Sequence, residues 1–176
     1  MPTALDLKDR GLAHFRAERL EEAAEAFAQA AHAFAEQNER ASAAEMMNNV
    51  AVVCLAQQKY ALALNAVQGT PAVFRALGDP LREAQATMNL GNALDNLGRL
   101  TEALPKYEHA IALFTELGET ENRAVCWKAL STVQIKLDKK LQALASMHAG
   151  LTLTPELSTK EKTLKGLLDQ AMKLLS

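Results

Sequence analysis

The sequence has few aromatic residues and no long apolar run. Aromatic side chains make up 5% of the 176 residues and apolar residues 49%, so alanine and aliphatic side chains must fill the core. Such a composition suits helices that pack closely through small residues. No stretch approaches the roughly 18 uninterrupted apolar residues of a membrane span. The first residues carry no charged segment followed by an apolar run, so we expect no signal peptide and a cytoplasmic location.

The residue patterns that accompany common catalytic and metal sites are also missing. Cys54 and Cys126 form no C-x-x-C pair, and we expect buried, reduced thiols at both positions. The four histidines show neither an H-E-x-x-H pattern nor another metal-ligand spacing. There is no G-x-S-x-G elbow and no Walker loop, and the glycines are too scattered for a dinucleotide fingerprint. We therefore expect a non-enzymatic protein without a cofactor or metal.

Charge is nearly balanced overall but unevenly distributed. The formal net charge is −2, which gives no nucleic-acid signature. Residues 121–176 hold nine Lys/Arg and five Asp/Glu, whereas the rest of the chain holds ten and sixteen. Two interpretations remain open: these charges form the solvated outer faces of helices, or the basic end docks an acidic partner.

A repeat of about 40 residues organises the chain. Positions one step apart carry matching small or apolar residues, which is expected when packing sets the repeat. Each unit reads as two helices, and the units must stack because one pair cannot bury both of its apolar faces. The clearest matches are Ala23, Ala63, Ala103 and Ala143, and also Phe34, Phe74 and Phe114.

We expect one domain over residues 1–176, built from four such units and a final helix. A capping box, Ser158-x-x-Glu161, precedes an apolar face at about residues 157–175, which predicts a helix that covers the last unit. The alternative is a helix that binds a partner or swaps between copies. The register slips by one residue near Lys139 in this interpretation. The repeats are expected at about residues 3–38, 39–78, 79–118 and 119–155.

Local signals predict several helix ends. Thr3 with Asp6 can cap the first helix, and Asp79 followed by proline is a helix start. Gly118 is expected to end its helix in the left-handed conformation, and Thr120 to cap the next one.

Two prolines fall inside expected second helices. Pro71, after Gly69 and Thr70, should kink or break its helix, because proline lacks an N–H and its ring crowds the carbonyl four residues earlier. The break is either a tolerated irregularity on the convex side or a bend that reshapes the groove. Pro105 is tolerable if its helix begins at about Thr101 or Glu102.

The last unit carries Trp127-x2-Leu130-Ser131 and Ala143-x3-Met147, and the third carries Leu90-Gly91 and Ala103-x3-Tyr107. These residues resemble the tetratricopeptide repeat. The length of the step is similar to that of the long variety found in kinesin light chains, spindle-orientation adaptors and bacterial peptide-pheromone receptors. The resemblance implies an all-α fold, a right-handed α-α superhelix of four helix-turn-helix repeats plus a C-terminal capping helix. It also implies that the first helices line a concave face.

The resemblance further indicates which first-helix residues point into this groove. Asparagines are prominent among them, although asparagine is a poor interior helix former and has no local capping role here. Each amide offers a donor and an acceptor to a peptide backbone. The alternative is that Asn49 and Asn89 bond neighbouring repeats while the others face water. The expected groove residues are Lys8, Leu12, Phe15, Asn48, Asn49, Val52, Leu55, Gln85, Met88, Asn89, Asn92, Asn96, Lys128 and Thr132.

Chaperone-binding relatives grip a C-terminal carboxylate with five Lys/Arg and Asn side chains from three units. In one register this sequence offers only Lys8 and Asn49, and in the next only Asn48 and Asn89. Two positions in five cannot neutralise the carboxylate in that way, so we expect no such clamp.

The function expected from these residues is an adaptor whose groove holds a peptide or helix of a partner protein, with no nucleic-acid or membrane partner. A first alternative is a structural subunit that associates with itself through its first unit or its C-terminal helix. A second is a peptide-sensing regulator, for which the sequence offers no helix-turn-helix.

Overall fold

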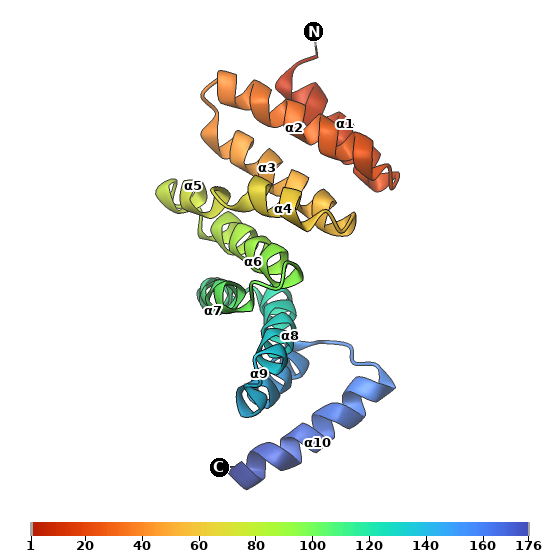
Figure 1. The fold of residues 1–176 in the computed structure, drawn as a ribbon, viewed down its shortest axis with the longest axis vertical. Helices are drawn as coiled ribbons and strands as arrows, with labels where there is room; N and C mark the ends of the chain where they lie inside the picture. Colours follow the sequence, from red (N-terminus) through yellow and green to blue (C-terminus); the bar gives the residue numbers. More distant parts are fainter. Residues whose placement is uncertain (1, 176) are drawn as a thin grey trace. The chain divides into compact units, whose positions relative to one another are not determined.

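The computed structural model describes residues 2–175, and every regular element in that range is an α-helix (Figure 1). The all-α prediction is therefore confirmed. None of these helices is both long and apolar enough to cross a membrane. The helices are α1 (Ala4–Arg16), α2 (Leu20–Glu36), α3 (Arg40–Ala56), α4 (Tyr60–Val67), α5 (Thr70–Ala76), α6 (Pro80–Asn96), α7 (Leu100–Glu116), α8 (Thr120–Lys136), α9 (Lys140–Leu153) and α10 (Thr159–Leu175).

The helix starts follow the repeat closely. From α2 to α9, apart from the additional α5, they are evenly spaced, at Leu20, Arg40, Tyr60, Pro80, Leu100, Thr120 and Lys140. The predicted slip near Lys139 is wrong, because α9 begins one full repeat after α7. Two compact units result, residues 1–98 with α1–α6 and residues 99–176 with α7–α10. A single domain over the whole chain stays a prediction.

The turns between helices explain this regularity. After α2, Asn38 takes a left-handed conformation (φ 60°), and the N–H of Glu39 donates to the carbonyl of Phe34 at 2.9 Å. This is a Schellman turn, which satisfies the last carbonyls of a helix. Gly118 (φ 72°) ends α7 in the same way, as predicted, and the N–H of Glu119 donates to Phe114.

Helix starts were predicted well where a side chain caps them. The N–H of Asp6 donates to the Thr3 hydroxyl at 3.1 Å, and the Asp79 carboxylate accepts from the N–H of Arg82 at 3.0 Å. The Thr120 prediction is wrong: Thr120 is the first residue of α8, and Glu119 stands at the cap without a side-chain bond. The preceding Schellman turn fixes where α8 begins, so no cap is needed there.

Small residues let the helices approach closely. The recurring alanines, from Ala23 to Ala143, are at most 2% exposed. Gly11 in α1 lies against the Phe27 ring of α2, where an added Cβ would stand 2.5 Å from the ring carbon Cδ1. Phe27 itself is 2% exposed and belongs to the core of the first unit, together with Phe34 and Met46. The repeat is thus held by small residues facing large ones.

The predicted break at Pro71 is present. Helix α4 ends at Val67 and α5 begins at Thr70, with Pro71 in its first turn. Pro71 cannot donate to the Val67 carbonyl, and the buried Thr70 hydroxyl donates to it instead at 2.9 Å. Pro105 leaves α7 unbroken, although α7 begins at Leu100 and Pro105 is its sixth residue, later than predicted.

The C-terminal helix only partly covers the second unit. Thr154 is extended before Pro155, and the Ser158–Glu161 capping box then starts α10. Leu168 is 3% exposed in the contact with α9. On the same helix, Leu164, Leu167 and Leu174 are 38%, 60% and 88% exposed.

Candidate partner-binding site

A chain of charged side chains joins α1, α3 and α6 in the first unit. The Lys8 ammonium lies 2.7 Å from one Glu45 oxygen, and the Arg82 guanidinium lies 3.1 Å from the other. Arg82 also donates to Asp79 at 2.6 Å and lies over the Phe74 ring, 5.5 Å from its centroid. The hydrogen bond from the Arg82 N–H holds the pKa of Asp79 below its ordinary value. These contacts connect three successive first helices and fix their outward-facing side chains.

Beside these charged side chains lies a polar pocket of about 220 Å³. Asn48, Asn49 and Gln85 line it together with Glu45 and Arg82. The three amide residues are half-buried, so their side chains are reachable from solvent.

Two of the predicted asparagines bond each other across this face. The Asn89 side-chain amide is turned away from solvent (8% exposed), and its Nδ2 donates to the side-chain oxygen Oδ1 of Asn48 at 3.0 Å. Asn89 therefore bonds the neighbouring repeat, which is the alternative expected from the sequence for this residue.

A smaller apolar pocket of about 110 Å³ adjoins the polar one. Leu12, Phe15 and Val52 line it, and Asn49 lines both pockets. Phe15 is 39% exposed. The structure thus gathers four of the predicted groove residues around one apolar hollow with an amide at its edge. We call the surface of these two pockets, on α1, α3 and α6, the first-helix face.

The other predicted groove residues belong to no pocket of this face. Leu55, Met88 and Asn92 are half-buried on α3 and α6, and the exposed Asn96 amide donates to the carbonyl of Asn92 at 2.8 Å. All four assignments stay predictions.

Lys128 and Thr132 lie on α8, in the second unit. The Lys128 ammonium is 3.2 Å from Glu161 of α10, so the chain's own C-terminal helix engages it. The Thr132 hydroxyl donates to the carbonyl of Lys128 at 3.2 Å, within its own helix. Their roles in partner binding also stay predictions.

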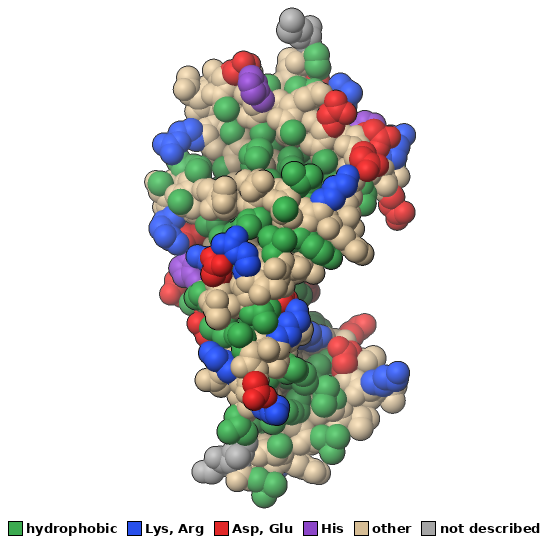
Figure 2. Space-filling view, in the orientation of Figure 1, with side chains coloured by type: hydrophobic (Ala, Val, Ile, Leu, Met, Phe, Trp, Pro, Cys, Tyr) green, Lys and Arg blue, Asp and Glu red, His purple; other side chains and the backbone are tan. Residues whose placement is uncertain are grey.

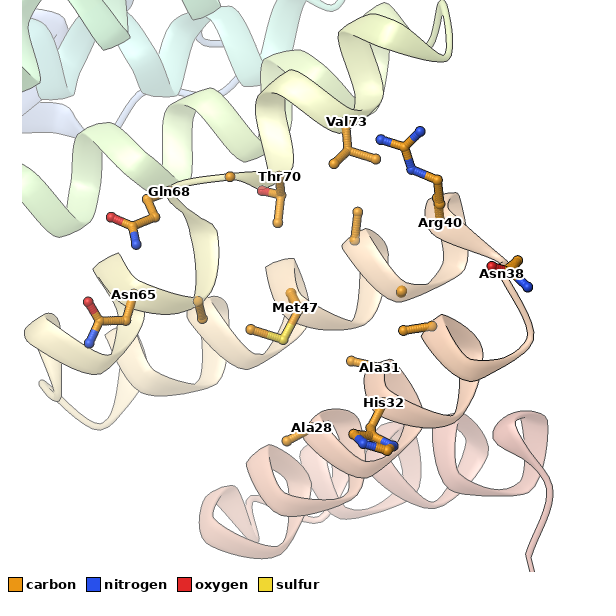
Figure 3. Close-up of a pocket in the computed structure, with 15 residues that line it drawn as sticks. Ala28, Ala31, His32, Asn38, Arg40, Met47, Asn65, Gln68, Thr70 and Val73 are labelled. Carbon is orange, nitrogen blue, oxygen red and sulfur yellow. The ribbon is translucent and has the colours of Figure 1, made fainter.

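A second hollow, which the sequence did not predict, lies between α2, α3 and the broken second helix α4–α5 (Figure 3). Its volume is about 730 Å³, and alanines of α2 and α3 line it with Met47 and Val73. Hydrophobic side chains gather over this part of the first unit in Figure 2. Gly69 and Thr70 at the break form one wall. The break therefore shapes this hollow, on a different side of α3 from the first-helix face.

Between residues 2 and 175 no group of three or more His, Cys, Asp or Glu could hold a metal ion. Cys54 and Cys126 are free and buried, as predicted. Burial raises the pKa of both thiols, that of Cys126 to about 12, so Cys126 is protonated and a poor nucleophile at neutral pH.

Solved structures of low sequence identity share this fold. Aspartyl phosphate phosphatase F from Bacillus subtilis aligns with a TM-score of 0.78 and 16% identity, over 94% of this chain and 45% of that one. BtubC (BKLC) from P. vanneervenii aligns with a TM-score of 0.78 and 19% identity, over 89% of this chain and 68% of that one. Apo RapI aligns equally well, with 15% identity, over 97% of this chain and 64% of that one.

Among curated proteins, Regulatory protein AfsR from Streptomyces coelicolor is 36% identical over 73 residues. That stretch is 42% of this chain and 7% of AfsR, so the chain corresponds to a small part of that protein. The family model for soluble NSF attachment protein, SNAP, matches residues 2–149, which is most of the chain. Together with the stacked helix pairs, this match shows that the chain belongs to the soluble NSF attachment protein family, whose fold is of the tetratricopeptide-repeat type.

Proposed function

We propose that this chain is a non-enzymatic protein–protein interaction module that binds a peptide or helix of a partner protein on its first-helix face. The observation that carries the proposal is the pair of adjoining pockets. Asn49 and Gln85 present amides that can bond both groups of a peptide backbone, and the hollow at Phe15 can take an apolar side chain.

The charged contacts within the first-helix face favour binding. Because Glu45 is held by both Lys8 and Arg82, the helices that carry the pockets are linked before a partner arrives. A surface that is already ordered loses less conformational entropy on association. The same pairing argues against catalysis, since the carboxylate and its two cations are engaged with one another.

A peptide complex is known for the same fold. The Rap conjugation gene regulator of plasmid pLS20 was solved with the Phr* peptide, and it aligns with a TM-score of 0.70 and 16% identity. The alignment covers 85% of this chain and 42% of that one. We propose peptide or helix binding for this chain by analogy. A cytoplasmic location fits the two reduced cysteines.

Affinity capture from a lysate of the source organism tests the proposal. Three baits run side by side: the wild type, Asn49→Ala/Gln85→Ala, and the matched control Asn122→Ala/Gln142→Ala, which removes an asparagine and a glutamine from the second unit. We expect a protein that the wild type and the control retain and that Asn49→Ala/Gln85→Ala loses. Equal capture by all three baits would contradict binding at the first-helix face.

A second candidate function, self-association, is favoured by one observation, the exposed leucines of α10. Leu167 and Leu174 are 60% and 88% exposed on a helix that already packs on α9. If they bind a second copy, the mass measured by sedimentation rises with protein concentration, and Leu167→Lys abolishes the rise. A constant monomer mass would rule this candidate out.

A further inference from the structure

The hollow between α2, α3 and α4–α5 has a counterpart two repeats later, between α7, α8 and α9. Six positions that line the first hollow have equivalents that line the second: Ala35, Ala43, Met47, Gln68, Gly69 and Val73 correspond to Thr115, Arg123, Trp127, His148, Ala149 and Leu153. The volume falls from about 730 Å³ in the first unit to about 370 Å³ in the second. In the second unit the chain itself puts an indole and a guanidinium where the first unit has methionine and alanine.

The larger hollow is a fixed feature of the first unit. Thr70 is 5% exposed, and its hydroxyl donates to the Val67 carbonyl, which Pro71 leaves without an amide donor at the break. Ala31 of its floor is buried, and Met47 is half-buried (Figure 3). An apolar hollow of this volume lies within the range of ligand-binding pockets.

The charges around the hollow indicate the sign of its ligand. Arg40, at the edge beside Val73 (Figure 3), is exposed and has no ion-pair partner among the described residues. His32 is the other ionisable lining residue, and its ring lies 3.5 Å from the Glu36 carboxylate. No carboxylate of the described residues lines the hollow itself. The position of Arg40 carries threonine, Thr120, in the second unit, so the cation is particular to the larger hollow.

We propose that this hollow is a second binding site, for an acidic amphipathic segment of a partner protein. One bulky apolar side chain of that segment would lie on the alanine floor, and a carboxylate would face Arg40. The chain's own exposed apolar helix fits poorly, because α10 carries Lys160, Lys162 and Lys165 and would bring like charge to Arg40. The site is separate from the first-helix face and can bind whether or not that face does.

Methionine methyl groups provide the test, because each region has its own reporter. Met47 lies in the hollow, Met88 on α6 beside the first-helix face, and Met147 in the second unit. The full chain, labelled at methionine methyl groups, is titrated with synthetic helical peptides that carry leucine, phenylalanine or tryptophan anchors flanked by glutamate. A matching set replaces glutamate with lysine. We expect a saturable shift at Met47 with the glutamate set, and unchanged Met88 and Met147.

Two kinds of variant separate the contribution of the Arg40 charge to binding from that of the apolar hollow. Arg40→Gln should weaken binding of the glutamate peptides by about 2- to 5-fold, the size of an exposed ion pair. Ala43→Phe should fill the hollow and abolish the shift. Ala35→Phe, at an exposed position of the rim, should do the same if Ala43→Phe proves unfolded by circular dichroism.

Several results would overturn the proposal. One is the absence of a saturable Met47 shift with every glutamate peptide, and another is equal affinity for the lysine set. A shift at Met88 in place of Met47 would move peptide binding to the first-helix face, which is the function proposed above. A Met47 shift that appears on raising the protein concentration alone would make a second copy the occupant.

Discussion

The two units share one repeat but use their first helices differently. In the first unit, Lys8, Glu45 and Arg82 bond one another across α1, α3 and α6 and leave two pockets beside them. In the second unit, Lys128 of α8 bonds Glu161 of the chain's own α10. The hollows behind the first helices differ as well, since Trp127 and Arg123 occupy space that Met47 and Ala43 leave open. The repeat therefore sets the backbone, and the residues between the recurring small positions decide which surface can bind.

The largest expected effect concerns Glu83, a buried carboxylate of the first unit. Arg75 holds Glu83 at 2.6 Å, and the Glu83 side chain is 6% exposed. Arg75→Leu should cost about 2–3 kcal/mol, because it removes the cation that pairs with this buried carboxylate. The matched control is Thr115→Leu at the corresponding exposed position of α7, where a change within about 0.5 kcal/mol is expected. Urea unfolding followed by circular dichroism measures the free energy of unfolding of both variants. Equal losses in the two variants would contradict this difference between the units.

Close packing of α1 on α2 should give the next effect. A Cβ at Gly11 would stand 2.5 Å from the buried Phe27 ring. Gly11→Ala should therefore cost about 1–2 kcal/mol in unfolding free energy, the cost of overpacking less the better helix propensity of alanine. The double variant Gly11→Ala/Phe27→Val, which copies the Ala51 and Val67 pair one repeat along, should lose less free energy of unfolding than the sum of the two single losses. Urea unfolding measures the three variants, and simple additivity of the two changes would count against this size matching.

Making the second unit resemble the first should have a smaller effect. Trp127 is the single tryptophan and is half-buried in the 370 Å³ hollow. Trp127→Met should cost about 1 kcal/mol, because part of its apolar contact is lost while the surface stays open to water. Thermal unfolding by circular dichroism gives the measurement. The converse change, Met47→Trp, should be close to neutral or stabilising, and a loss larger than that of Trp127→Met would show that the two hollows are not equivalent.

The smallest effect is the acid sensitivity of α10. The hydrogen bond from the Ser158 N–H lowers the pKa of Glu161 to about 2, and the hydrogen bond with His148 lowers that of Asp169. Carboxyls whose pKa is depressed by folding stabilise the folded state above their ordinary pKa, and this contribution disappears as pH falls. For Glu161 the loss runs from about pH 4.5 towards about pH 2. As pH falls, the methyl NMR signal of Met172 on α10 should report this loss before the signal of Met47 changes.

Two variants that each replace one glutamate by glutamine sharpen this last test. Glu161→Gln should weaken the contact of α10 with the second unit already at neutral pH, and it should flatten the acid transition at Met172. Glu156→Gln, an exposed position in the preceding loop, should leave the transition in place. An acid transition that is unchanged in Glu161→Gln would assign the effect to another group.

The features that the sequence predicted are those with local or periodic causes. The Thr3 and Ser158 capping boxes, the break at Pro71 and the turn at Gly118 each depend on a few neighbouring residues. The core positions follow from the repeat. Thr120 was misassigned because a Schellman turn, which the left-handed residue before it determines, fixes the helix start without a side-chain cap.

The parts of the candidate sites that were not predicted depend on side chains far apart in the sequence, or on space that small side chains leave unfilled. Glu45 and Arg82 are far apart in the sequence, and only the stacked helices show that they meet. The bond between Asn89 and Asn48 was predicted only as an alternative, because residue type alone does not distinguish a groove contact from a bond between repeats. The larger hollow arises because small residues and a helix break coincide. A comparison of each position with its equivalent two repeats later could have indicated it, since Ala43 aligns with Arg123.

Site-specific photo-crosslinking in cells of the source organism tests partner binding at the first-helix face most directly. Benzoylphenylalanine replaces Phe15, which is 39% exposed on the first-helix face, or Leu62, which is 56% exposed on α4 as the control. We expect a covalent adduct with a partner protein from position 15 and none from position 62. Adducts with a partner from position 62 alone, or adducts of the chain only with itself, would contradict this expectation.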